Sequence, residues 1–229
     1  MVQYEFKKTI TFLFAISVAF LSFSQKITKV YYLETSNFNI SNLGLSKSNN
    51  VKKNEREYLL QFNDSLGEYK NISNTKNDIL DSFLGYKGSF LYDIKKRKTY
   101  RKQGKYLIEK GFENYNWELT GETSIIDTLV CYKATTSIKV KGKRRIITKQ
   151  VIAWYTTEIC TPIGPKGFSG LPGLIVELKI DKVTICLNKI NYLQKDLNVN
   201  FLKSGRKFNE IEFEVFIDSL TQNINLKPH

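Results

Sequence analysis

The chain has 229 residues, a formal net charge of +13, one histidine and three cysteines. A chain of this length forms one domain and is long enough to bury a hydrophobic core. The histidine is the last residue, His229, which argues against serine or cysteine catalysis with a histidine base. The sequence has neither a zinc-ligand spacing nor a complete phosphate-binding loop, so we expect no cofactor.

The N-terminus has the features of a secretory signal peptide. A charged start precedes an uncharged apolar stretch at residues 10–21, and small residues follow it. The stretch is shorter than the roughly 20 residues that a membrane-spanning helix needs. We expect a signal peptide over 1–24, cleavage between Ser24 and Gln25, and export of the mature domain to the periplasm, the outer envelope or the exterior. No later stretch is apolar enough to be a transmembrane segment.

The positive charge indicates the class of partner. An exported basic protein is expected to meet an envelope protein, anionic lipid or acidic glycan rather than nucleic acid, although charge also serves solubility. One basic cluster lies within residues 95–102 and a second within 141–145. Both fall at expected hairpin turns, where they form either one positive patch or two separate solvated turns; the second arrangement is the commoner one.

Runs typical of β-strands dominate the first half of the chain. Residues 26–35 are rich in β-branched and aromatic side chains, and 57–72 read as strand, turn and strand. Residues 89–110 predict two or three short strands around a basic turn. The intervening segment 39–54 is rich in Asn, Ser, Gly and Lys, which predicts a long loop.

A hairpin is predicted in the middle of the chain. Residues 129–140 alternate between apolar and polar side chains, 141–144 supply a glycine-containing turn, and 145–159 return. The return strand has apolar residues at both odd and even positions, which predicts burial on both faces.

The C-terminal segment predicts a helix near 208–223. Asn209 is placed to cap its start, and Ile211, Val215 and Leu220 are near helical spacing. Runs of strands with one late helix favour a mainly β fold, all-β or α+β: a single domain with a curved antiparallel sheet. The half-barrel of periplasmic lipoprotein carriers is a fold-level analogy for it.

The stretch GPKGFSGLPGLIVELKI, residues 164–180, combines stiff and flexible residues before a strand-like run. Pro172 and Gly173 suit a type II turn with Gly173 at positive φ, where a side chain would cost about 1 kcal/mol. Residues 174–180 then alternate as a buried strand. The loop therefore sets the register of that strand.

This stretch resembles the signature of the GLPGLI family, which comprises exported Bacteroidetes proteins of unassigned function. Upstream blocks extend the resemblance over residues 115–178. Cys160 departs from the family pattern, which usually has proline there, and this weakens any disulfide scheme taken from relatives. The resemblance implies an envelope protein with no established reaction. The matching residues are Trp117, Glu122, Cys131, Ala134, Trp154, Tyr155, Glu158, Gly164, Pro165, Phe168, Leu171, Pro172, Gly173 and Leu174.

Two functions follow as hypotheses. The first is a non-enzymatic binding or assembly protein for a peptide, lipid or glycan partner, which predicts an apolar groove. The alternative is a carboxylate-based hydrolase using Glu158 or Glu177. For both acids a structural role is the stronger interpretation, because a pair of acids without pocket geometry is weak evidence for catalysis.

Two further groups of side chains stay open at this stage. The aromatic residues Trp117, Trp154 and Tyr155 either line a ligand groove or, as is commoner in strands, pack in the core. An exported protein can form disulfides, and both Cys131–Cys186 and Cys160–Cys186 pairings fit the sequence.

Overall fold

A computed structural model describes five stretches of the chain. The expected signal peptide and its cleavage site lie outside them, as does nearly all of the expected loop at 39–54. The described stretches are residues 26–36, 54–73, 88–141, 145–194 and 205–225.

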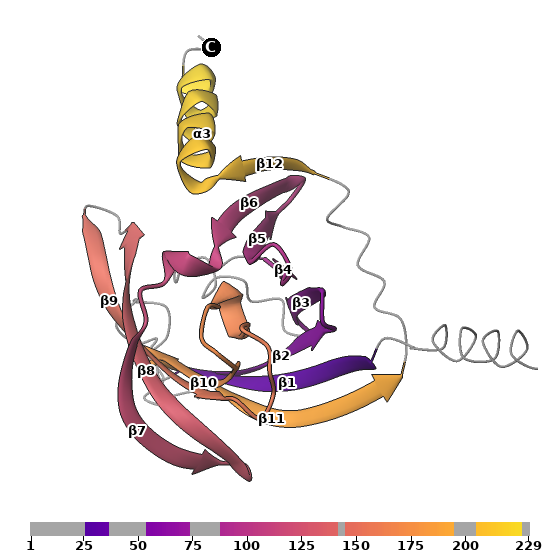
Figure 1. Cartoon of the computed structure of the whole chain (residues 1–229). Helices are drawn as coiled ribbons and strands as arrows, with labels where there is room; N and C mark the ends of the chain where they lie inside the picture. The colour runs from indigo at the N-terminus through magenta and orange to yellow at the C-terminus, as the bar shows by residue number, and fades with distance from the viewer. Residues whose placement is uncertain (1–25, 37–53, 74–87, 142–144, 195–204, 226–229) are drawn as a thin grey trace, which may run out of the picture.

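Twelve strands of this part of the chain form one curved sheet that does not close into a barrel (Figure 1). Their order across the sheet is β12-β6-β5-β4-β3-β2-β1-β11-β10-β9-β8-β7. Neighbouring strands are antiparallel, except that β12 runs parallel to β6. The predicted fold class, mainly β with a curved sheet and a C-terminal helix, is confirmed. The bounds are β1 (Lys26–Ser36), β2 (Asn54–Phe62), β3 (Leu66–Asn71), β4 (Phe90–Asp93), β5 (Lys98–Gln103), β6 (Tyr106–Gly111), β7 (Glu118–Ile126), β8 (Leu129–Lys141), β9 (Ile146–Thr156), β10 (Leu174–Ile180), β11 (Val183–Gln194) and β12 (Arg206–Asn209).

The predicted hairpin is β8 and β9, but the predicted burial of β9 holds only over its second half, where one face is buried and the other is half-buried. Ile146 and Ile147 are 68% and 41% exposed. The reason is the length of the next strand: β10 ends at Ile180, which pairs with Val151. Residues 146–150 therefore extend beyond β10 and have only β8 beside them.

The concave side of the sheet is filled by the chain itself. We call residues 161–171 the plug loop; it contains the short 3-10 helix η4 (Pro165–Gly167) and lies inside the curl (orange, Figure 1). Every residue from Ile163 to Ser169 is buried. The main hydrophobic core forms around this loop from side chains of β1 to β4 and β8 to β11.

The helix α3 (Glu210–Asn225) begins two residues later than predicted because Arg206–Asn209 form β12. Asn209 caps it as expected: its Oδ1 accepts a hydrogen bond from Glu212 N at 2.8 Å, and Glu212 Oε2 accepts one from Asn209 N at 2.9 Å. No helix within the described residues is long and apolar enough to cross a membrane.

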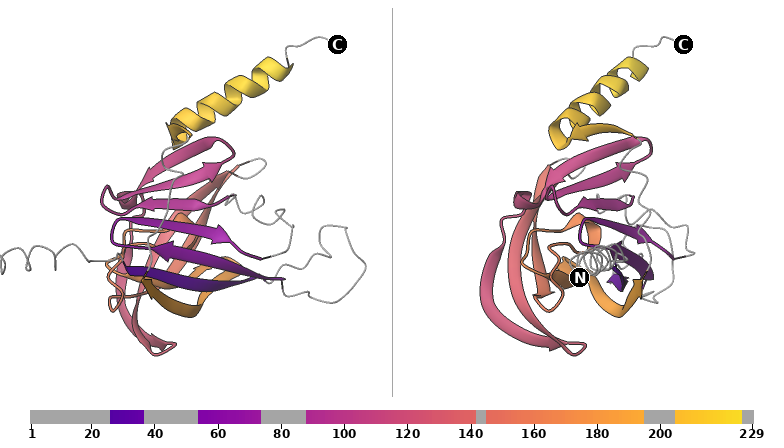
Figure 2. Two further views of the ribbon diagram at one scale, coloured as in Figure 1. Left: turned by 90° about the vertical axis from the view of Figure 1, so that its right-hand side faces the viewer. Right: turned by 45° about the vertical axis from the view of Figure 1, so that its right-hand side comes forward.

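The predicted apolar stripe of this helix is wrong. Ile211 and Val215 are 75% and 65% exposed, whereas Phe213 is buried. Phe213 and Phe216 pack on Tyr106 and Phe208 at ring-centroid distances between 5.0 and 5.9 Å. Aromatic rings bury more area than Ile or Val, so they set the packing face. Only the first part of α3 contacts the sheet, and the rest projects away from it (Figure 2).

Candidate functional site

Four motif residues, Gly164, Pro165, Phe168 and Leu171, belong to the plug loop, which Trp117 and Tyr92 hold in place. Trp117 Nε1 donates a hydrogen bond to the carbonyl of Ser169 at 2.9 Å. The Tyr92 hydroxyl donates to the Gly164 carbonyl at 2.6 Å and accepts from Gly167 N at 3.0 Å. These contacts tie the loop to β4 and to the segment that precedes β7.

The other motif positions are mostly core. Trp154 packs against the main core, and the rings of Tyr155 and Tyr132 lie 5.8 Å apart. The interpretation of Trp117, Trp154 and Tyr155 as packing residues is therefore the one the geometry supports. Among the motif residues, Cys131, Ala134, Tyr155, Gly164, Pro165, Phe168, Leu171, Gly173 and Leu174 are buried, Trp117 and Trp154 are half-buried, and Glu122, Glu158 and Pro172 are exposed.

Gly173 is required for a different reason from the one predicted. It does not adopt a positive φ; in this segment Lys166, Gly167 and Gly170 do, at 55°, 82° and 98°. A Cβ added to Gly173 would lie 1.9 Å from the carbonyl oxygen of Thr156. Glycine is needed there because the backbones of β10 and β9 approach closely, so the expected type II turn is wrong.

A buried charged cluster connects the plug loop to β1 and β2. Lys166, which is 3% exposed, places its Nζ 2.8 Å from Glu34 Oε2 and donates a hydrogen bond to the Tyr58 hydroxyl at 2.8 Å. Glu34 also faces Arg56, its direct partner across β1 and β2, with Oε1 3.9 Å from Nη1. Removing Lys166 would leave the buried Glu34 with only the more distant Arg56 as its charged partner, so losing this side chain is costly.

Sequence reasoning missed this cluster, although one signal was present. Glu34 follows Val30 and Tyr32 at the same alternating positions of β1, and both of those side chains are buried. A charged residue on the core face of a strand needs a partner of opposite charge. That signal identifies Glu34 but not its partner.

The tyrosines around the plug loop predict alkaline sensitivity. Burial raises the pKa of Tyr32, Tyr69 and Tyr92 above the usual value of 10.0. Unfolded tyrosines ionise near pH 10 while these stay neutral, so the stability present below about pH 10 is lost as the pH rises further. We expect the melting temperature to fall above about pH 10, together with the appearance of tyrosinate absorbance.

A variant pair tests this origin. Tyr92→Phe should reduce the slope of melting temperature against alkaline pH, whereas Tyr192→Phe, at a residue that is 55% exposed, should leave it unchanged. Equal slopes in the wild type and Tyr92→Phe would contradict the prediction.

The candidate acids and thiols make structural contacts. Glu158 Oε1 accepts a hydrogen bond from Val130 N at 2.8 Å, and Glu177 Oε2 accepts one from the Cys186 thiol at 3.5 Å. Cys131, Cys160 and Cys186 are all free thiols, so neither pairing proposed from the sequence is present. Burial raises the pKa of the Cys131 thiol, and burial with Glu177 raises that of Cys186 to about 11. Both thiols are therefore protonated at neutral pH and are poor nucleophiles.

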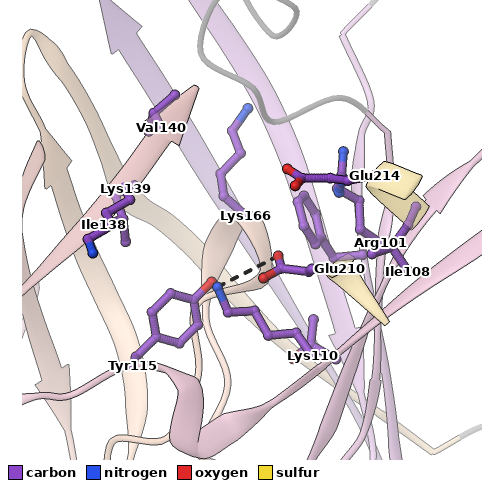
Figure 3. Close-up of a pocket in the computed structure, with 13 residues that line it drawn as sticks. Arg101, Ile108, Lys110, Tyr115, Ile138, Lys139, Val140, Lys166, Glu210 and Glu214 are labelled. Atoms are coloured by element: carbon purple, nitrogen blue, oxygen red, sulfur yellow. Dashed lines mark ion pairs between the residues drawn. The ribbon is translucent and has the colours of Figure 1, made fainter. Parts of the chain in front are cut away.

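An open pocket lies at the mouth of the curved sheet, above the plug loop. This mouth pocket has a volume of about 290 Å³. Figure 3 shows Arg101 and Lys110 with two glutamates of α3 on one side, and residues 138–140 of β8 on the other. Its lining residues are Phe90, Thr99, Arg101, Ile108, Lys110, Tyr115, Ile138, Lys139, Val140, Lys166, Gly167, Glu210 and Glu214.

The basic clusters are only partly within the described residues. Residues 94–97 form the turn between β4 and β5, where Lys95, Lys96 and Arg97 are exposed. The second cluster, within 141–145, lies mostly outside the described stretches, so a joint positive patch stays a prediction. Within those stretches, no group of three or more His, Cys, Asp or Glu side chains could hold a metal ion.

Comparison with known proteins gives a partial family match. Residues 142–177 match the model of a family described as a protein of unknown function (Porph_ging), which is associated with Bacteroidetes. The matched segment includes Trp154, Tyr155 and the Gly164–Gly173 stretch. The GLPGLI name itself stays a resemblance. No curated protein matches the chain.

The chain is similar in fold to two solved structures of one protein. The structure of PNGF-II in a C2 crystal superimposes with a TM-score of 0.53 and 14% identity over 84% of this chain. The P21 crystal form gives a TM-score of 0.51 and 12% identity over 84% of this chain. This chain spans about a third of PNGF-II, 32% and 33%. At such identities the likeness concerns the fold alone.

Proposed function

We propose that this chain is an exported, non-enzymatic protein of the cell envelope that binds a partner at the mouth pocket. The observation that carries the proposal is the pocket itself, which combines charged and apolar walls at the open end of the sheet. Sites for small ligands are typically concave and mainly apolar, with a few placed polar groups. The signal-peptide features and the net charge of +13 support an envelope location.

The structure favours a peptide or glycan partner over a lipid held inside the curl. A lipid carrier needs an apolar groove along its concave face, as the sequence hypothesis expected. In the described residues that face is covered by the plug loop, whose residues from Ile163 to Ser169 are buried. The partner is therefore bound at the edge of the fold, beside β6, β8 and α3.

The hydrolase alternative has less support. A catalytic carboxylate must face a substrate-sized space, but Glu158 and Glu177 are not among the residues that line the mouth pocket. Their hydrogen bonds to Val130 N and the Cys186 thiol give each a structural role.

Site-specific photo-crosslinking in the native envelope tests the proposal. A benzophenone amino acid at Ile147, which is exposed and pairs with Val140 of the pocket wall, should give adducts with a protein or glycan. The same group at Tyr192, which is exposed on β11 and does not line the pocket, is the matched control and should give none. Absence of adducts from Ile147, or equal adducts from both positions, would contradict the proposal.

A further inference from the structure

We infer that the mouth pocket recognises a carboxylate group on its ligand, with Arg101 as the main contact and Lys110 as the second. This inference rests on the proposed function and names the chemistry of the partner. It applies to a peptide carboxylate and to a uronic acid of a glycan alike, because both present the same planar group.

The guanidinium of Arg101 has N–H donors available for a ligand. It lies on β5, half-buried, and it lines the pocket. Its Nη1 donates to Gln103 Oε1 at 3.2 Å, and within the described part of the chain the guanidinium makes no other hydrogen bond or ion pair. Burial lowers the pKa of the guanidinium, and Glu210 and Tyr115 oppose that shift. A guanidinium stays charged in proteins and has five N–H donors in a fork that matches a carboxylate.

Lys110 forms a long ion pair with the carboxylate of Glu210 on α3. Its Nζ lies 3.9 Å from Glu210 Oε1, beyond hydrogen-bond distance, and 4.5 Å from the centre of the Tyr115 ring. The side chain of Glu210 is 55% exposed. An ion pair this long and this exposed contributes little stability. A ligand carboxylate that also contacts Arg101 would therefore displace Glu210 at small cost.

The other walls of the pocket determine which kind of group can carry the carboxylate. Ile108, Ile138 and Val140 give the pocket apolar surface for an aliphatic, aromatic or sugar-ring body. A volume of about 290 Å³ accommodates one such group. The cations of the lining outnumber its two acids, Glu210 and Glu214, so the pocket attracts an anion. Inorganic phosphate has no such body to place against the apolar walls, so a carboxylate that carries one is favoured over it.

Calorimetric or NMR titration of the mature protein with small probes tests the inference. The probes are N-acetylphenylalanine, its neutral amide, D-glucuronate and inorganic phosphate. We expect one of the two carboxylates to bind at least about tenfold more tightly than the amide and the phosphate. Whether N-acetylphenylalanine or glucuronate binds better distinguishes a peptide source from a glycan source. Binding of the amide or phosphate as tightly as either carboxylate, or no binding of either carboxylate, would overturn the inference.

Two substitutions with opposite expected effects on carboxylate affinity make the test specific. Arg101→Gln should weaken carboxylate binding at least about tenfold, and Glu210→Gln should strengthen it about two- to fivefold by removing the competing internal group. Lys102→Gln, at the next residue of β5, and Asp218→Asn, an exposed acid on α3, are matched controls and should change nothing. Equal effects of Arg101→Gln and Lys102→Gln would show that only net charge matters and would overturn the inference.

The crosslinking experiment separates this inference from the proposed function. If Arg101→Gln leaves the adduct yield from Ile147 unchanged, carboxylate recognition is wrong while a mouth-bound partner still stands. If Ile147 gives no adduct in the wild type, the proposed function fails, whatever the small probes do.

Discussion

Replacing Gly173 with alanine should lower the free energy of unfolding by about 3 kcal/mol, the upper part of the range for overpacking a well-packed site. The added Cβ would lie 1.9 Å from the carbonyl oxygen of Thr156 and 2.6 Å from its carbonyl carbon. Both are backbone atoms of β9, so no rotamer change relieves the clash. The start of β10 would have to move away from its neighbour. Urea unfolding monitored by circular dichroism measures the loss.

Gly104→Ala is the matched control for this prediction. Gly104 has a positive φ of 58°, and no atom lies within 4 Å of an added Cβ. Gly104→Ala should lower the free energy of unfolding only by the cost of a positive φ for alanine, about 1 kcal/mol. A loss in Gly173→Ala no greater than that in Gly104→Ala would show that the close approach of β9 and β10 does not constrain this position.

Replacing Lys166 with methionine should cost about 3–5 kcal/mol, the range measured when one partner of a buried ion pair is removed. Methionine keeps the length of the side chain but removes the ammonium 2.8 Å from Glu34 Oε2. The Glu34 carboxylate would then retain Arg56 at 3.9 Å as its neighbour. We expect the unfolding midpoint in urea to fall strongly.

Two further variants identify the cause. Lys179→Met removes an exposed ammonium from β10 and should change stability by less than about 0.5 kcal/mol. Adding Glu34→Gln to Lys166→Met should cost less than the sum of the two single losses, because both substitutions remove the same 2.8 Å ion pair. Fully additive losses in the double variant would show that the loss in Lys166→Met does not come from its ion pair with Glu34.

The position of the plug loop explains why the motif has the composition that it has. Pro165 and Gly167 bracket Lys166, whose φ of 55° is uncommon for a residue with a side chain. A Cβ on Gly167 would lie 2.5 Å from the Phe90 ring, and one on Gly164 would lie 2.5 Å from Ile175 Cβ. The glycines therefore allow this stretch to pack closely in the interior, where the Lys166 side chain pairs with Glu34.

Local features of the fold were predictable from the sequence because short-range interactions determine them. The hairpin of β8 and β9 follows from alternation on both sides of a short turn, and Asn209 caps α3 through a residue three positions away. The apolar face of α3 was mispredicted because the sequence does not show which side meets Tyr106 of β6. The mouth pocket was not predictable, since β5, β6, β8 and α3 contribute to it from distant parts of the chain.

The sequence by itself determined a β-rich chain, the presence of its hairpins and a capped terminal helix. These depend on periodicity and turn chemistry within a few residues. Only the tertiary structure decided that the motif loop folds into the concave side, that Lys166 meets Glu34 and Tyr58, and that Gly173 is needed for close approach. The Lys166–Tyr58 contact joins residues 108 positions apart, and no local pattern specifies which distant charges share one buried site.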